Sequence, residues 1–350
     1  MRAIAVSGPG ADPVLVELPK PEPRPGEVRV RIEYASLNPL DWQVVDGSAG
    51  DLAPAPRSFP FVVGVDYAGR VDMIGGGENR FRVGDAVFGR AGVVGAAPGD
   101  AGAAGGAGAA PGDAGATGGA GAPDACGTYG EYVCVPQDSA ITLVPRGLDP
   151  RAAAALPSAG TAAAQILEAV ALRGHETLLV VGAAGGIGCC LTQLARARDI
   201  RVIAAVRGDE RSAMGSLGAA ATVDLTAGPP AEALRSACPD GIDALADLAS
   251  ATPEAFAVHA AAVRPGGIAL STRGTAAGAR LPGGVRGVDF RLDPSPVLLD
   301  VLAAGAADGV LRVLIDAEFP LEQAPQALER NRAGGARGKT VIVLHAPGHC

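Results

Sequence analysis

The segment Thr177–Gly208 constrains the fold more than any other part of the chain. An apolar run, Leu178–Val181, leads into a glycine-rich turn, Gly182–Gly188, and a helical pattern begins at once. A second apolar run, Val202–Val206, follows at the spacing that one crossover helix requires. Glycines let the backbone approach a pyrophosphate, and the free N–H groups at a helix start favour an anion. The segment therefore predicts a dinucleotide-binding turn, with a bland turn as the less favoured alternative. Its expected contacts are Gly182, Ala183, Ala184, Gly185, Gly186, Ile187 and Gly188.

Arg207 ends the second strand, where an NAD site usually has an acidic residue for the ribose hydroxyls. Arg211 follows one helical turn later. A cation at this position can pair with a 2′-phosphate, which favours NADPH as the cofactor. Asp209 and Glu210 lie just beyond and argue against it, and a solvated surface charge is the alternative.

Strand and helix patterns alternate from residue 152 to residue 292, with Gly287–Leu292 as a possible edge strand. This order predicts an α/β fold of the Rossmann type, a doubly wound parallel sheet. Residues 1–90 are β-rich, and further strand and helix patterns close the chain after residue 293. We therefore expect the Rossmann unit (152–292) to be inserted in a mostly β domain built from 1–151 and 293–350.

Two 13-residue copies, 95–107 and 108–120, differ only at Ala104 and Thr117. Glycine and alanine bury too little area to offset the entropy of ordering, so a flexible insertion over 91–125 is expected. An inert insertion is favoured over a functional lid.

Composition excludes several function classes. The net charge of −8 and pI near 5.1 argue against a nucleic-acid partner. No apolar stretch is long enough to predict a membrane span, and the N-terminus has no secretory pattern. Six cysteines show no CxxC spacing and are interpreted as reduced thiols of a cytoplasmic protein. The group His345, His349 and Cys350 is interpreted as a frayed end in preference to a metal site.

Six further motifs accompany the glycine-rich turn. They are SLNPLDW (36–42), GVDYAG (64–69), FRVGDAVFG (81–89), GTYGEYVCVP (127–136), SAGTAA (158–163) and RGKTVIVL (337–344). Together they resemble the zinc-free medium-chain dehydrogenases/reductases, in the quinone oxidoreductase (zeta-crystallin-like) branch. The similarity covers nearly the whole chain outside 91–125. It implies a GroES-like catalytic domain around the Rossmann unit.

The resemblance also bears on metal binding. Zinc-dependent relatives have a Cys where Asn38 stands and a His–Glu pair where Val65–Asp66 stand, and their structural-zinc cysteine cluster is missing here. Without thiolate or imidazole ligands we expect no metal. The resemblance implies that hydride passes from NADPH to a quinone or an α,β-unsaturated carbonyl, whose enolate oxygen needs only hydrogen-bond donors.

Three residues are candidates for catalysis. Asn38 is expected to orient the substrate or the nicotinamide ribose, with a plain turn residue as the alternative. Asp41 is expected to shape that loop by hydrogen bonding, in preference to acting as a base. Tyr67, like Tyr34, is a possible proton donor, although core packing is favoured for both.

The remaining candidates border the substrate or the cofactor. Trp42, Asp66 and Phe88 are expected near the substrate pocket, with packing or structural roles as alternatives. Thr161 resembles a family threonine near the nicotinamide, and Ser271 ends a strand where the cofactor crevice opens. Lys339 resembles a family lysine near the cofactor phosphates, and a surface lysine is the alternative.

The sequence leaves the substrate open beyond a small molecule. A tailoring enoyl or keto reductase of polyketide-type metabolism is an alternative, as is a non-catalytic NADPH-binding protein of the same fold. Zinc-free relatives are often dimers that pair Rossmann edge strands, so the resemblance implies a homodimer through Gly287–Leu292.

Overall fold

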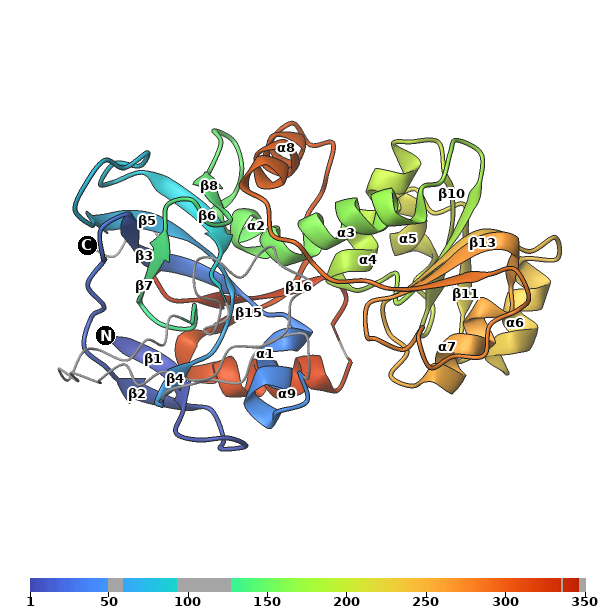
Figure 1. The fold of residues 1–350 in the computed structure, drawn as a ribbon, viewed down its shortest axis with the longest axis horizontal. Helices are drawn as coiled ribbons and strands as arrows, with labels where there is room; N and C mark the ends of the chain where they lie inside the picture. The colour runs from blue at the N-terminus through green and yellow to red at the C-terminus, as the bar shows by residue number, and fades with distance from the viewer. Residues whose placement is uncertain (50–58, 93–126, 335, 346–350) are drawn as a thin grey trace, which may run out of the picture.

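The computed structural model describes residues 1–49, 59–92, 127–334 and 336–345, which form two lobes (Figure 1). The second lobe is built around a six-stranded parallel sheet with the strand order β11-β10-β9-β12-β13-β14. The strands are β9 (Thr177–Val181), β10 (Arg201–Val206), β11 (Ala221–Asp224), β12 (Ile242–Asp247), β13 (Val263–Ser271) and β14 (Arg286–Asp289). The order reverses between β9 and β12, and ligands of such sheets bind beyond the carboxyl ends of the strands at this point.

Helices cover both faces of this sheet. They are α3 (Pro157–Val170), α4 (Gly186–Arg196), α5 (Arg211–Ser216), α6 (Pro230–Ala237) and α7 (Pro253–Ala260). All five residues of β9 are buried, and alternate residues enter different cores: Leu178 and Val180 face one, Leu179 and Val181 the other. A continuous apolar run therefore becomes a central strand covered on both faces, which confirms the doubly wound prediction.

The first lobe joins strands from both ends of the chain. Its larger sheet has the order β15-β16-β3-β5-β6-β8, and β7 also pairs with β3; a smaller sheet has the order β2-β1-β4. The strands are β1 (Arg2–Val6), β2 (Val14–Glu17), β3 (Glu27–Ser36), β4 (Phe61–Val62), β5 (Asp66–Ile74), β6 (Ala86–Arg90), β7 (Tyr132–Pro136), β8 (Ile141–Leu143), β15 (Ile315–Pro320) and β16 (Lys339–Val343). Because β16 pairs with β3, residues near the C-terminal end lie beside those that precede residue 40.

The helices of this lobe are α1 (Pro39–Asp46), α2 (Pro150–Ala155), α8 (Pro296–Ala307) and α9 (Ala324–Arg332), with a 3-10 turn η2 (Leu321–Gln323) before α9. Figure 1 shows α3 continuing from α2 toward the second lobe, so this helix connects the two. None of the described helices is long and apolar enough to cross a membrane.

The structure differs from the sequence prediction at several boundaries. Residues 39–46, for which no helix was predicted, form α1, because Asn38 precedes a proline at the first helical position and its N–H is accepted by Asp41. The stretch 61–74 forms two strands, β4 and β5, separated around Gly64, which has φ of +97°. The helical stretch after Asp149 is interrupted before Pro157, as a proline there predicts, and β14 spans Arg286–Asp289 where Gly287–Leu292 was expected. The repeat 95–120 lies outside the described residues.

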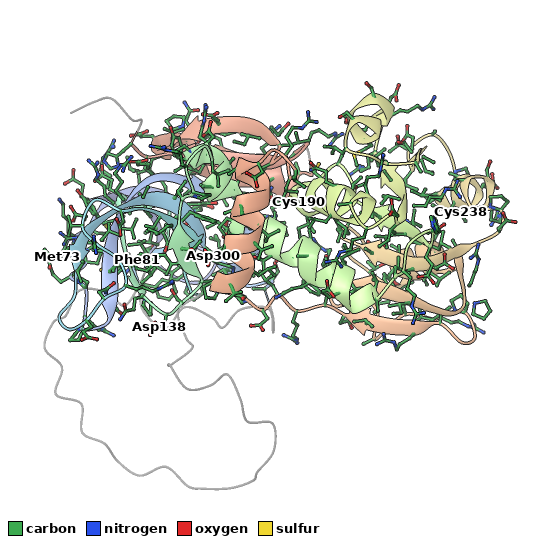
Figure 2. The ribbon with its side chains drawn as sticks, turned by 90° about the horizontal axis from the view of Figure 1, so that it is seen from above. Met73, Phe81, Asp138, Cys190, Cys238 and Asp300 are labelled. Carbon is green, nitrogen blue, oxygen red and sulfur yellow. The ribbon has the colours of Figure 1, made fainter. Side chains whose placement is uncertain are left out.

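In the described part of the chain, four cysteines are buried and form no disulfide: Cys134, Cys189, Cys190 and Cys238. Figure 2 shows Cys190 near the middle of the molecule and Cys238 far out in the second lobe. Cys126, His349 and Cys350 are outside the described residues. Of the terminal group expected to fray, only His345 is described, and its Nδ1 lies 2.9 Å from Ile32 O.

Candidate active site

Four buried polar side chains meet where the two lobes join. Asn38 precedes α1, Asp66 begins β5, Ser158 lies in the first turn of α3, and Lys339 begins β16. Each comes from a different segment, and all are at most 9% exposed. We call them the junction cluster. Each member hydrogen-bonds to at least one other member, as the next paragraphs describe.

Lys339 supplies the positive charge of the junction cluster. Its Nζ donates to Leu37 O at 2.8 Å and to Asn38 Oδ1 at 2.7 Å, and lies 3.8 Å from Asp66 Oδ2. Burial lowers the pKa of Lys339, while Asp66 opposes that shift. A Cβ at Gly186 would lie 2.5 Å from Lys339 Cδ. The lysine belongs to β16 of the first lobe, and its stem packs against Gly186 at the start of α4 in the second lobe.

The Asn38 amide is held at both ends. Its Nδ2 donates to Asp66 Oδ2 at 2.9 Å and to Ser36 O at 3.3 Å, while its Oδ1 accepts from Lys339. The donors on one side and the ammonium on the other fix which way the amide faces. Every hydrogen-bonding direction of its amide nitrogen is thus used within the protein.

Asp66 also bonds to α3. Its Oδ1 accepts from Ser158 Oγ at 2.7 Å, and its Oδ2 accepts from the Ser158 N–H at 3.1 Å. Arg90 Nε donates to the same Ser158 Oγ at 3.2 Å. Asp66 is therefore a buried carboxylate that links β5, α3 and, through Ser158, the end of β6.

Asp41 lies beneath the loop that carries Asn38. Its Oδ2 accepts from the Asn38 N–H and from Tyr129 Oη, both at 2.8 Å. Burial raises the pKa of Asp41 to about 7 and outweighs the two hydrogen bonds, which lower it. Burial, together with the nearby Asp41, raises the pKa of Tyr129 well above its usual range. This geometry fits the expected loop-shaping role of Asp41.

The glycine-rich turn has the geometry that its sequence predicts. Gly182 has φ of 80°, and a Cβ at Gly188 would lie 2.5 Å from Ala183 Cα. Gly185 caps α4, whose first N–H groups have no acceptor within the helix. Residues 184–187 are partly exposed, so the positive end of the helix is accessible. A dinucleotide pyrophosphate fits these donors.

Cations lie near the end of β10. Arg207 and Arg211 are exposed. Glu210, which weakened the case for a phosphate at this position, forms an ion pair with Arg337 Nε. Arg337 Nη2 also donates to Arg207 O at 3.2 Å. The local acidic charge is thereby partly compensated by a residue that sequence reasoning did not single out.

Ser271 is the last residue of β13, at the carboxyl edge of the parallel sheet, and Thr161 lies on α3. Ser271 Oγ accepts from the N–H of Arg273 at 3.0 Å and of Thr275 at 3.2 Å, and so holds the turn after β13. Thr161 is buried on α3, three residues after Ser158, which places both on one face of the helix.

Three predicted residues lie away from the junction cluster. Trp42 packs on α9, where its Nε1 donates to Asn331 Oδ1 at 3.3 Å and Arg332 lies over its ring. Tyr67 is fully buried in the core of the first lobe, and its hydroxyl has no hydrogen-bond partner among the described residues. Phe88 is fully buried and packs in the core shared with α2 and α3.

Sequence reasoning missed Ser158, Tyr129 and Arg90. Ser158 and Tyr129 lie in motifs that were recognised, but their hydrogen bonds to Asp66 and Asp41 join residues 92 and 88 positions apart. Arg90 follows Phe88 closely, and a single arginine at a strand end carries no pattern of its own.

The residues at the zinc-ligand positions of the resemblance do not suit zinc. Asn38 offers an amide that is already bonded, Val65 is apolar, and Asp66 is bonded to Asn38 and Ser158. Zinc in proteins takes thiolate, imidazole or carboxylate ligands in a tetrahedral set. Within the described residues, no group of three or more His, Cys, Asp or Glu is placed to hold a metal ion.

Known proteins share both the sequence pattern and the fold. The alcohol dehydrogenase GroES-like domain model matches residues 24–146, and the zinc-binding dehydrogenase model matches residues 217–342. The chloroplastic quinone oxidoreductase QR1 of Triphysaria versicolor is 28% identical over 98% of this chain and 98% of its own. A quinone oxidoreductase from Coxiella burnetii has a TM-score of 0.79 at 24% identity, covering 99% of each chain. A mycobacterial protein solved in complex with NADPH has a TM-score of 0.76 at 22% identity, covering 98% of this chain and 100% of that chain. The two domain models together cover most of the chain, which therefore belongs to the medium-chain dehydrogenase/reductase family and is similar to its quinone oxidoreductases.

Proposed function

We propose that this chain is an NADPH-dependent reductase of quinones or α,β-unsaturated carbonyls that works without zinc. The observation that carries the proposal is the contact between Lys339 and Asn38 beside the start of α4. Through this contact the junction cluster lies next to the glycine-rich turn, which suits a pyrophosphate, and the cluster stands where zinc-dependent relatives have metal ligands.

NADPH is proposed over NADH because of charge. Arg207 and Arg211 are exposed beyond the end of β10, where the adenosine ribose of a Rossmann cofactor lies. Arg337 pairs with Glu210 and so reduces the repulsion that a 2′-phosphate would meet. The mycobacterial relative in complex with NADPH has the same fold and is compatible with this choice.

Bound NADPH supplies a hydride from its reduced nicotinamide. Addition of a hydride at the β-carbon of an enone, or to a quinone, moves negative charge onto the carbonyl oxygen. The protein's part is to hold the reactants and to donate hydrogen bonds to that oxygen. Thr161 on α3 is proposed to lie beside the nicotinamide, and the junction cluster fixes the position of the loop before α1. Water supplies the final proton.

The same proposal extends to assembly and location. Strand β14 is the exposed edge of the six-stranded sheet, so two copies that pair along β14 would form one continuous sheet. We therefore propose a homodimer. In each copy the catalytic domain comprises 1–151 and 293–350, and the Rossmann domain comprises 152–292. The free cysteines of the described residues fit a reducing compartment such as the cytoplasm.

A titration and a substrate panel test the function. NADPH fluorescence should change on addition of the protein, and NADPH should then be oxidised by quinones or by enones. Binding without oxidation across both classes would indicate a non-catalytic NADPH-binding protein. No binding of NADPH at millimolar concentration would contradict the proposal as a whole.

A further inference from the structure

Arg90, the last residue of β6, has a position that the proposed function does not yet use. It is the register partner of Asp66 in the β5–β6 pair, and its backbone N–H bonds to Ala140 O at 2.8 Å. Its side chain turns toward α3, where Nε donates to Ser158 Oγ. Strand pairing and this hydrogen bond together fix the guanidinium beside the junction cluster.

Only one edge of the Arg90 guanidinium is used. Among the described residues, Nε has Ser158 as its partner, and no carboxylate lies within 4 Å of the guanidinium to form an ion pair. Asp66 is reached only through Ser158, whose hydroxyl donates to the carboxylate. Within the described part of the chain, the two terminal nitrogens of Arg90 have no partner and can bind a negatively charged oxygen.

Lys339, the other cation nearby, is not available in the same way. Its ammonium has three hydrogens, two of which go to Leu37 O and Asn38 Oδ1, while Asp66 lies on the remaining side. Its charge is also balanced by Asp66. Arg90 is half-buried, whereas Lys339 is buried, so Arg90 is the cation that an incoming molecule can reach.

The location suits the reacting carbonyl. Ser158, which holds Arg90, and Thr161, which we propose lies beside the nicotinamide, are three residues apart on one face of α3. A guanidinium held by Ser158 is thus about one helical turn, or ~5 Å, from the proposed place of hydride transfer. A half-buried cation there acts in a medium less polar than water, which strengthens its attraction to an anion.

We propose that Arg90 is a catalytic residue that binds the carbonyl oxygen of the substrate and stabilises the negative charge formed there, a role that rests on the proposed function. The hydride of NADPH bonds to the β-carbon, the carbon–carbon π pair becomes the enolate double bond, and the carbonyl π pair moves to the oxygen. NADPH is oxidised to NADP⁺ and the substrate is reduced. Arg90 donates to the oxyanion without losing a proton, and water then protonates the α-carbon.

The test compares Arg90→Ala and Arg90→Gln with a matched control, Arg70→Ala. Arg70 lies on the neighbouring strand β5 and pairs with Glu33, away from the junction cluster. Loss of an oxyanion donor should lower kcat by about a hundredfold in both Arg90 variants. The Kd for NADPH should stay within about twofold of the wild type, because the interaction forms only with the reacting substrate. Arg70→Ala should behave as the wild type.

Two readouts separate this role from a structural one. Added guanidinium ion should restore part of the activity of Arg90→Ala and none of that of Arg90→Gln, whose side chain fills the space. 4-Nitrophenol, whose phenolate resembles an enolate, should bind the NADP⁺ complex of the wild type as the phenolate, seen by its absorbance. That binding should be lost in both Arg90 variants even where turnover is too slow to follow.

If the wild type turns over and Arg90→Gln has the same kcat and the same phenolate binding, the role of Arg90 is overturned while the proposed function stands. If neither quinones nor enones support NADPH oxidation by the wild-type protein, the proposed function is overturned, and the role of Arg90 with it.

Discussion

Lys339 Nζ lies 2.7 Å from Asn38 Oδ1, although the two residues are 301 positions apart in the chain. The lysine begins β16, and the asparagine follows β3, with which β16 pairs. The contact exists because strands from both ends of the chain share one sheet. It joins the loop before α1 to the glycine-rich turn, against which the lysine stem packs.

Loss of the Lys339 charge should destabilise the protein. In Lys339→Met the carboxylate of Asp66 stays buried without its counter-charge, and breaking such a buried pair costs about 3 kcal/mol. The free energy of unfolding, measured with urea, should fall by that order. Arg235→Met is the control: Arg235 is an exposed cation on α6, and its substitution should change stability by less than about 0.5 kcal/mol. Equal stabilities of both variants would contradict the account of the junction cluster.

Asp41 should make stability depend on pH. Because burial raises its pKa to about 7 in the folded protein, the folded state binds more protons than the unfolded state between about pH 4 and 7. Wild-type stability should therefore fall, relative to Asp41→Asn, as the pH rises through that window. The limiting difference in slope is about 1.4 kcal/mol per pH unit.

Asparagine at position 41 can still accept from the Asn38 N–H and Tyr129, so the variant isolates the charge. Urea titrations of both proteins at several pH values measure the difference. Parallel curves from pH 4 to 7 would show that Asp41 ionises normally.

Tyr67→Phe should be as stable as the wild type or more stable. The Tyr67 hydroxyl is fully buried and no described residue hydrogen-bonds to it, so its removal relieves a desolvation cost of about 1 kcal/mol. Activity should be unchanged, because the ring lies in the core away from the junction cluster. A large loss of kcat in this variant would restore Tyr67 as the proton donor that its motif suggested.

Gly188→Ala should impair both packing and cofactor binding. The added Cβ would lie 2.5 Å from backbone atoms of Ala183, and overpacking of this kind costs about 1–3 kcal/mol. Gly215→Ala, in α5, is the control, because nothing lies within 4 Å of the added atom. It should be neutral or slightly stabilising, as alanine is the better helix former. Thermal unfolding and NADPH titration distinguish the two variants.

Arg207→Ala should raise the Kd for NADPH by about tenfold, because it removes one charged hydrogen bond to the 2′-phosphate. The Kd for NADH should stay unchanged. Arg235→Ala, which removes an exposed cation from α6, should alter neither value. An equal effect of Arg207→Ala on both cofactors would argue against a 2′-phosphate contact.

The fold was predictable where the signal is local. The turn at Gly182–Gly188 follows a buried strand and begins a helix, so neighbours in sequence are neighbours in space. The alternation of strand and helix after residue 152 fixed the doubly wound sheet for the same reason. Helix α1 was missed because its eight residues are few and begin at a sequence that also suits a turn.

The junction cluster was only partly predictable. Asn38, Asp66 and Lys339 were each singled out, but their mutual contact depends on β16 pairing with β3, which no local pattern encodes. Adjacent Tyr67 and Asp66 were both taken as site candidates, although successive residues of a strand face opposite sides. Asp66 faces α3, and Tyr67 therefore faces the core.

The most direct test of metal-free, NADPH-dependent reduction uses protein that has been dialysed against a chelator. NADPH oxidation is measured by its absorbance, with a quinone and an enone as acceptors. The account predicts that turnover persists, that elemental analysis finds no stoichiometric zinc, and that added zinc does not increase kcat. Activity that is lost on dialysis and returns only with zinc would contradict it.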